Sequence, residues 1–269
     1  MNPSLVVELL CLGTFGGFMA GLLGIGGGMV LVPFMTIIIS HRGVPGDMAV
    51  KMAIATSMAT ILFTSLSSMR AHHKRGAVRW PIVASIAPGI LIGGLLGGAG
   101  AFSLLKVQAL ALFFAAFVGV SATQMLRHRP PRPGRELPGP MGQAAAGTGI
   151  GFVSGLVGAV GGFLSVPFMT WCNVPMHQAV ATSAALGFPI ALSNTLGYLV
   201  GGWALPAALP GAVGYLYLPA LGVVVLASMS MAPLGARAAH AMDVAQLRRV
   251  FALVLYGLAG YMLWKSFHT

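Results

Sequence analysis

Two segments of the chain carry a basic residue followed, five and six positions later, by a threonine and a serine. The two sets are Lys51, Thr56 and Ser57, and His177, Thr182 and Ser183. Hydroxyl groups can donate hydrogen bonds to an anion, and a basic residue adds positive charge, so each set could form part of an anion-binding site. The hydroxyls could equally bond to carbonyls of their own helix, and the basic residues could mark a membrane interface. For Lys51 alone the interface role is the stronger interpretation, and the recurrence of a basic residue at one repeat position adds weight to the binding role.

A glycine cluster followed by a proline precedes each of these sets. The candidate residues are Gly24, Gly26, Gly27, Gly28 and Pro33, and Gly158, Gly161, Gly162 and Pro167. Glycine weakens a helix interior and permits left-handed backbone, so consecutive glycines favour an unwound stretch. Within a bilayer, an unwound backbone is tolerated only where protein buries it or where it lines a wet cavity. We therefore predict that both clusters interrupt helices and take part in binding, and that the GxxxG pairs elsewhere, such as Gly93 with Gly97, serve close helix packing.

The remaining chemistry-bearing residues do not form a catalytic constellation. The seven histidines are scattered, and no HExxH or comparable metal motif is present. The first glycine cluster also fails the dinucleotide pattern, because Met29 stands where the third glycine should be. We therefore expect neither an enzyme nor a bound metal or cofactor. Asn194, close in sequence to the second hydroxyl pair, is a further candidate for substrate binding.

The composition is that of a membrane protein. Apolar residues make up 57% of the chain and charged residues only 7%, and the mean hydropathy is +0.89. A soluble domain carries roughly 25% charged residues. The formal net charge of +11 does not indicate nucleic acid as a partner, because the basic residues cluster in short loops between apolar segments. Basic loops of this kind stay cytoplasmic, so we expect the Arg127–Arg135 segment on the cytoplasmic side of the membrane.

The chain is duplicated. Gly13–Thr36 aligns without gaps with Gly147–Thr170, and the run Pro-Phe-Met-Thr ends both segments. This alignment divides the chain into a first repeat (1–126), a basic, proline-rich linker (127–141) and a second repeat (142–269). The predicted fold is an all-α polytopic membrane bundle of two inverted repeats, with a broken first helix in each.

The number of membrane crossings has two solutions. Residues 5–39 would form a helix of about 52 Å at 1.5 Å per residue, longer than the hydrocarbon core of about 30 Å, so a break is required. Counting the broken region once gives eight spanning segments, and counting it twice gives ten. Ten crossings separate the basic residues better, with both termini outside, and an odd number of crossings per half inverts the repeats.

The glycine-proline elements Gly21–Phe34 and Gly155–Phe168, together with the two Ala-Thr-Ser segments, resemble the TauE/SafE family of sulfite and sulfonate exporters. The resemblance covers nearly the whole chain. It implies a bacterial inner-membrane carrier of small anions, often sulfur-containing, and eight spans are usual for the family. An anion channel and a carrier of small carboxylates are the alternatives. The substrate, the direction of transport, coupling to a proton or another ion, and the oligomeric state do not follow from the sequence. The inverted duplication predicts that the two breaks meet near mid-membrane, where the anion binds.

Overall fold

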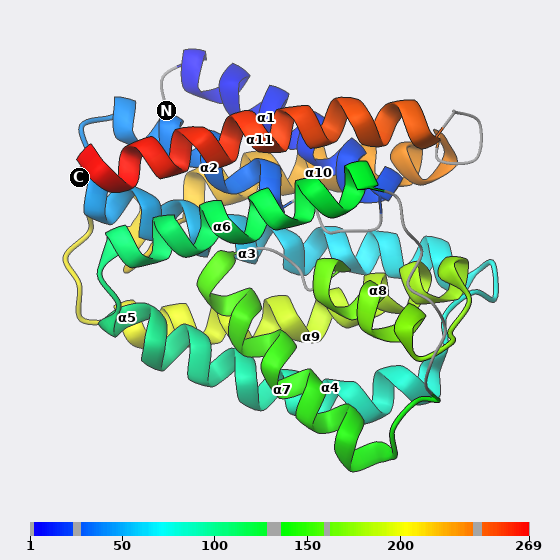
Figure 1. Cartoon of the computed structure of the whole chain (residues 1–269). Helices are drawn as coiled ribbons and strands as arrows, with labels where there is room; N and C mark the ends of the chain where they lie inside the picture. Colours follow the sequence, from blue (N-terminus) through cyan, green and yellow to red (C-terminus); the bar gives the residue numbers. More distant parts are fainter. Residues whose placement is uncertain (1–2, 24–27, 128–135, 159–161, 239–243, 269) are drawn as a thin grey trace.

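The computed structural model describes residues 3–23, 28–127, 136–158, 162–238 and 244–268 of the 269-residue chain. Nearly all of this part is helical, which confirms the predicted all-α bundle (Figure 1). The elements are α1 (Pro3–Leu23), α2 (Gly28–His41), α3 (Gly46–His73), α4 (Trp80–Leu95), the π-helical η1 (Leu96–Ala101), α5 (Phe102–Leu104), α6 (Val107–Arg127), α7 (Pro140–Val157), α8 (Gly162–Trp171), α9 (Met176–Gly202), β1 (Ala212–Val213), β2 (Leu216–Tyr217), α10 (Leu218–Ala238) and α11 (Val244–His268).

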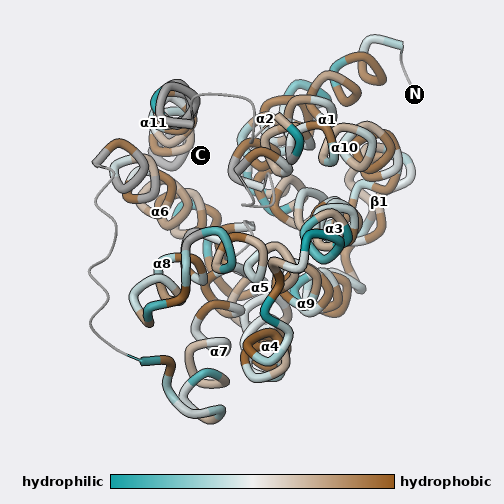
Figure 2. The backbone as a smooth tube through the Cα atoms, turned by 90° about the vertical axis from the view of Figure 1, so that its right-hand side faces the viewer, coloured by the Kyte–Doolittle hydropathy of each residue, from teal (hydrophilic) through white to brown (hydrophobic). Residues whose placement is uncertain are grey.

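Five helices in the described part are long and apolar enough to cross a bilayer. They lie within α1, α3, α4 continued through η1 and α5, α9 and α10. In the view along the bundle, brown hydrophobic stretches appear on most helices, between white and teal ones (Figure 2). Large apolar side chains such as Leu104, Val200 and Leu226 are exposed, as expected where a helix faces lipid. The total of eight to ten crossings stays a prediction.

All four tryptophans are exposed and lie near helix ends. Trp80 begins α4 and Trp171 ends α8, at the right-hand end of the bundle in Figure 1. Trp203 follows α9 and Trp264 lies near the end of α11, at the opposite end. Tryptophan is enriched where a membrane protein meets the lipid headgroups. The two pairs therefore mark the two edges of a membrane-embedded bundle.

The two halves of the chain exchange helices. The first helix of each half packs against the fourth helix of the other half, α1 against α10 and α7 against α4, and Figure 2 shows both pairs side by side. The third helices, α3 and α9, pack against each other, and so do the last helices, α6 and α11. This pattern is what a pseudo-two-fold axis between the halves produces.

Corresponding helices run in opposite directions. The backbone N–H of Arg79, just before α4, reaches Thr182 near the start of α9, while Gly201 at the end of α9 lies beside Ala99 in η1. Helix α9 is therefore parallel to α4. Because the short turn between α3 and α4 reverses the chain, α3 is antiparallel to its counterpart α9. Both chain termini lie at the same end of the bundle (Figure 1).

Small residues allow the exchanged helices to approach closely. A Cβ added at Gly93 of α4 would lie 2.0 Å from the Thr148 carbonyl oxygen of α7, and one at Gly151 would lie 2.4 Å from the Ile90 oxygen. On α1, a Cβ at Gly17 would lie 2.4 Å from the Cα of Ser228 in α10. Neither interface has room for a larger residue, so these GxxxG glycines act in packing, as predicted.

The second and third helices of each half form a hairpin with the same turn. Gly43 and Asn173 both have positive φ, at 81° and 64°, and a Val-Pro pair follows each of them. The α2–α3 hairpin is longer by about one helical turn on each arm. Ten positions separate Pro33 from Gly43, but only six separate Pro167 from Asn173.

Candidate substrate site

The second half has a helix break where the glycine cluster predicts one. Helix α7 ends at Val157, and Gly158 follows with a left-handed φ of 68°, its N–H donating to the Ser154 oxygen at 2.9 Å. Helix α8 then begins at Gly162. Glycine adopts this conformation without the steric cost that a Cβ brings, which explains why a glycine stands at the break.

In the first half, α1 ends at Leu23 and α2 begins at Gly28. The predicted site residues Gly24, Gly26, Gly27 and Gly161 lie outside the described residues. Gly28 and Gly162 are the buried first residues of α2 and α8. The prolines lie inside these helices, Pro33 buried and Pro167 partly exposed.

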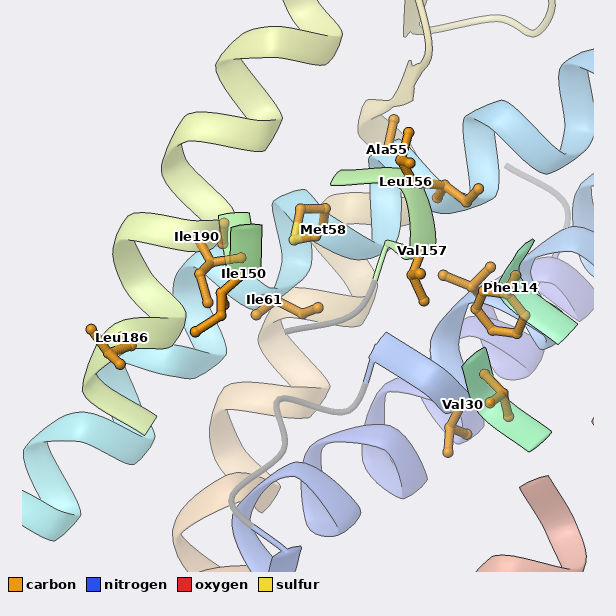
Figure 3. Packing of buried hydrophobic residues seen from close by; sticks show 14 of the residues in the cluster. Val30, Ala55, Met58, Ile61, Phe114, Ile150, Leu156, Val157, Leu186 and Ile190 are labelled. Carbon is orange, nitrogen blue, oxygen red and sulfur yellow. The ribbon is translucent and has the colours of Figure 1, made fainter. Parts of the chain in front are cut away.

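The break of the second half lies against the first half. A Cβ built at Gly158 would be 2.8 Å from Cγ2 of Ile54 in α3 and 3.1 Å from Cγ2 of Val32 in α2. Figure 3 shows Leu156 and Val157, at the end of α7, near Ala55 of α3. The left-handed residue that ends α7 therefore contacts both arms of the opposite hairpin, close to where α2 begins.

The two repeated threonines connect the halves. Thr56 Oγ1 accepts the backbone N–H of Tyr217 at 3.0 Å, and Thr182 Oγ1 accepts that of Arg79 at 3.0 Å. Tyr217 and Arg79 occupy the same place in their halves, immediately before α10 and α4. Each hydroxyl thus binds the backbone that enters the fourth helix of the opposite half. The sequence pattern contained no signal for this contact.

The two repeated serines have different surroundings. Both are fully buried, with 0% of the side chain exposed. Ser183 Oγ lies 2.7 Å from Ser165 Oγ of α8, in a hydrogen bond in which either atom can donate. Ser57 Oγ has no hydrogen-bond partner among the residues that the structure describes.

The two basic residues also differ. The Lys51 ammonium donates to the Ser103 oxygen at 3.1 Å and lies 5.8 Å and 5.7 Å from the ring centres of Phe102 and Tyr215. His177 is exposed on the first turn of α9. The additional helical turn in the α2–α3 hairpin explains the difference, because it places Lys51 deeper in its helix than His177.

Asn194 connects α9 to α7 near the second break. Its amide nitrogen donates to the Ile190 oxygen at 2.8 Å and to the Gly151 oxygen at 3.4 Å. A Cβ at Gly155 would lie 2.2 Å from the Asn194 Oδ1 atom, so a larger residue there would displace the Asn194 side chain. One turn later, the buried Tyr198 hydroxyl donates to the Gly155 oxygen. The sequence interpretation missed Tyr198, although its i, i+4 spacing from Asn194 places it on the same helix face.

Acidic side chains among the described residues lie at the protein surface, and Asp47 stands one helical turn before Lys51 on α3. Glu8, Asp47 and Glu136 are exposed, and Glu8 lies 3.7 Å from Arg42. The described residues contain no group of three His, Cys, Asp or Glu side chains arranged to hold a metal ion. The described part of the site offers helix N–H groups and hydroxyls, which suit a negatively charged ligand.

The fold and this region define a class: polytopic helical membrane proteins whose two halves exchange helices around a broken segment. Within that class, the chain belongs to the Sulfite exporter TauE/SafE family, whose profile matches residues 9–262. It is therefore a multi-pass membrane protein of the plasma membrane, as predicted.

The chain is similar to several proteins named as probable membrane transporters. It is 34% identical to one from Haemophilus influenzae over 260 residues, covering 96% of this chain and 98% of the relative. It is 29% identical to one from Methanocaldococcus jannaschii, covering 80% of this chain and 84% of the relative. One from Bacillus subtilis is also 29% identical and covers 77% of this chain and 84% of the relative. No solved structure matches the chain.

Proposed function

We propose that the protein is a secondary transporter that moves small sulfur-containing anions, such as sulfite or sulfonates, by alternating access. One observation carries the proposal: the helix break at Gly158 contacts the opposite hairpin at Val32 and Ile54, close to the start of α2. Broken helices at corresponding places of two repeats are typical of substrate sites in secondary transporters.

The electrostatics of this region favour an anion. The first N–H groups of α2 have no acceptor within their own helix, and the helix dipole adds positive potential there. Helix α2 has 14 residues, and the hydroxyl of Ser57 lies on the neighbouring arm of the same hairpin. An anion can accept hydrogen bonds from both kinds of group.

The opposed directions of the halves suit alternating access. The turn at Gly43 and the turn at Asn173 lie at opposite ends of the bundle, because α3 and α9 are antiparallel. A site between the two hairpins can therefore open toward either end by an equivalent movement of one half against the other.

The family description supports the substrate class, and the names of the relatives support membrane transport. The family description names sulfite export, and the relatives are named probable membrane transporters. A membrane transporter is thereby favoured over an enzyme. Small carboxylates are the rival substrates, and an anion channel is the rival mechanism.

Purified protein in proteoliposomes tests the proposal. We expect sulfite, thiosulfate or a small sulfonate to raise the apparent melting temperature and to show saturable flux with counterflow. A ligand at 100 times its Kd stabilises the native state by about 2.7 kcal/mol. Acetate and lactate at the same concentration serve as controls. Stabilisation by carboxylates alone would exclude the sulfur-anion proposal, and single-channel currents without counterflow would exclude a carrier.

A further inference from the structure

We infer that the anion site is asymmetric, with Ser57 of the first half donating to the bound anion and Ser183 of the second half serving the protein structure. The inference rests on the proposed function, and it identifies which of two repeat-equivalent serines contacts the substrate. It starts from one residue difference between the halves.

Leu31 occupies the repeat position of Ser165. Leu31 lies three residues after Gly28, the first residue of α2, and Ser165 lies three residues after Gly162, the first residue of α8. The ungapped alignment of the two glycine-proline elements gives the same correspondence. In the second half, this position supplies the hydroxyl that pairs with Ser183 at 2.7 Å.

In the first half, the same position supplies a hydrocarbon side chain. Leu31 is 1% exposed, and a Cβ built at Gly16 of α1 would lie 2.9 Å from its Cδ2 atom. The leucine therefore packs toward α1 and offers no acceptor or donor to Ser57. This explains why Ser57 Oγ has no partner among the described residues while Ser183 has one.

A buried hydroxyl without a partner is unfavourable unless something else binds it. Ser57 lies beside the first turn of α2, by the same correspondence that places Ser183 beside the first turn of α8. Its hydroxyl and the free N–H groups of that turn are therefore neighbouring donors. Val32, one residue after Leu31, contacts Gly158 of the second half. The Ser57 hydroxyl, the start of α2 and the Gly158 break are therefore the groups between which we place the anion.

The second half lacks this arrangement, because Ser165 already satisfies Ser183. A ligand there would have to compete with a protein hydrogen bond. We therefore expect the anion to be held mainly by α2 and α3, although the repeat motif is the same in both halves.

Sulfite binding to the purified full-length chain in detergent tests the asymmetry, by titration calorimetry and by thermal shift. We expect Ser57→Ala to weaken sulfite affinity by roughly 10-fold or more, as for loss of a hydrogen bond to a charged group. Ser183→Ala should change affinity less than about 3-fold, and Ser57→Thr, which keeps the hydroxyl, should retain binding.

Leu31 provides a second comparison that leaves Ser57 in place. In Leu31→Ser, the introduced hydroxyl should pair with Ser57 as Ser165 pairs with Ser183, and sulfite affinity should fall. Leu31→Ala removes the same packing but adds no hydroxyl, so it is the matched control and should bind sulfite more tightly than Leu31→Ser. This pair keeps the inference testable even if Ser57→Ala does not fold.

The outcomes separate the inference from the proposed function. Equal losses in Ser57→Ala and Ser183→Ala, or unchanged affinity in Ser57→Ala, would overturn the asymmetry while leaving anion transport intact. Equal affinity of Leu31→Ser and Leu31→Ala would also overturn it. If the unaltered protein binds neither sulfite nor methanesulfonate, the proposed function fails and the inference fails with it.

Discussion

The α2–α3 and α8–α9 hairpins are alike in their threonine contacts and different in their length. In both, a threonine in the first half of the second arm accepts a backbone N–H from the opposite half, at 3.0 Å. In both, the turn contains a residue with positive φ. Yet the first arm is 14 residues long in one hairpin and 10 in the other. The position of the threonines relative to the opposite half is therefore the same in both hairpins, while the length of the arms differs.

The threonine positions and the hairpin tips are under different constraints, which explains why only the arm length differs. The register of Thr56 and Thr182 is fixed by their contacts with the opposite half, so an insertion next to either threonine would break its hydrogen bond across the halves. The tips project toward the ends of the bundle, where a complete helical turn can be added to both arms without rotating the side chains on either one. The two threonine contacts thus remain equivalent, whereas Lys51 and His177 acquire different surroundings.

The largest expected effect concerns the side of the membrane on which each hairpin ends. In a chain carrying Cys11→Ser and Cys172→Ala, we expect an impermeant maleimide to label His41→Cys on intact cells and to label His177→Cys only after permeabilisation. His177 adjoins Gln178, which pairs with Arg79 beside the basic α3–α4 turn, and basic loops stay cytoplasmic. Labelling of both positions from one side would contradict the inverted arrangement.

The start of the second hairpin should be sensitive to a single methyl group. Gly158→Ala places a Cβ on a left-handed residue, 2.8 Å from Cγ2 of Ile54. We expect a loss of about 2–4 kcal/mol in the free energy of unfolding, from the backbone strain and the steric overlap together. Gly149→Ala is the control, because a Cβ on that α7 residue meets open space. Unfolding in detergent measures both, and equal stability of the two variants would refute the left-handed break.

The equivalence of the Thr56 and Thr182 contacts can be tested by removing one hydroxyl at a time. Thr56→Val and Thr182→Val each leave a backbone N–H of the opposite half without its acceptor, so we expect each to cost about 1–2 kcal/mol. The matched controls are Thr36→Val and Thr170→Val, whose hydroxyls bond only to carbonyls of their own helices, and these should cost less. Melting temperatures would show similar losses for Thr56 and Thr182. Clearly different losses of melting temperature in Thr56→Val and Thr182→Val would mean that the two contacts between the halves are not equivalent.

The smallest effect concerns the two aligned basic residues. Lys51→Met should lower the free energy of unfolding by about 1 kcal/mol, because it removes a hydrogen bond and two cation–ring contacts. His177→Ala, on an exposed helix start, should change it by less than about 0.5 kcal/mol. Thermal melts of both variants check the comparison, and an equal loss would show that the additional turn does not distinguish their surroundings.

The sequence by itself determined the class of fold and the position of the interruption. Composition required a membrane bundle, because 7% charged residues cannot cover a soluble protein. The glycine cluster at Gly158 and the excess length predicted the break, since both depend on local backbone preference and on the thickness of a bilayer. The packing role of Gly93 and Gly151 followed from spacing alone.

Only the tertiary structure decided what each repeated polar side chain contacts. Thr56 and Thr182 bind backbone far away in sequence, through an exchange of helices that spacing along one helix cannot reveal. Ser57 and Ser183 look identical in the repeat, but their surroundings depend on whether the neighbouring helix presents a leucine or a serine. A hydrogen bond needs both partners within about 3 Å, and a sequence pattern specifies only one of them.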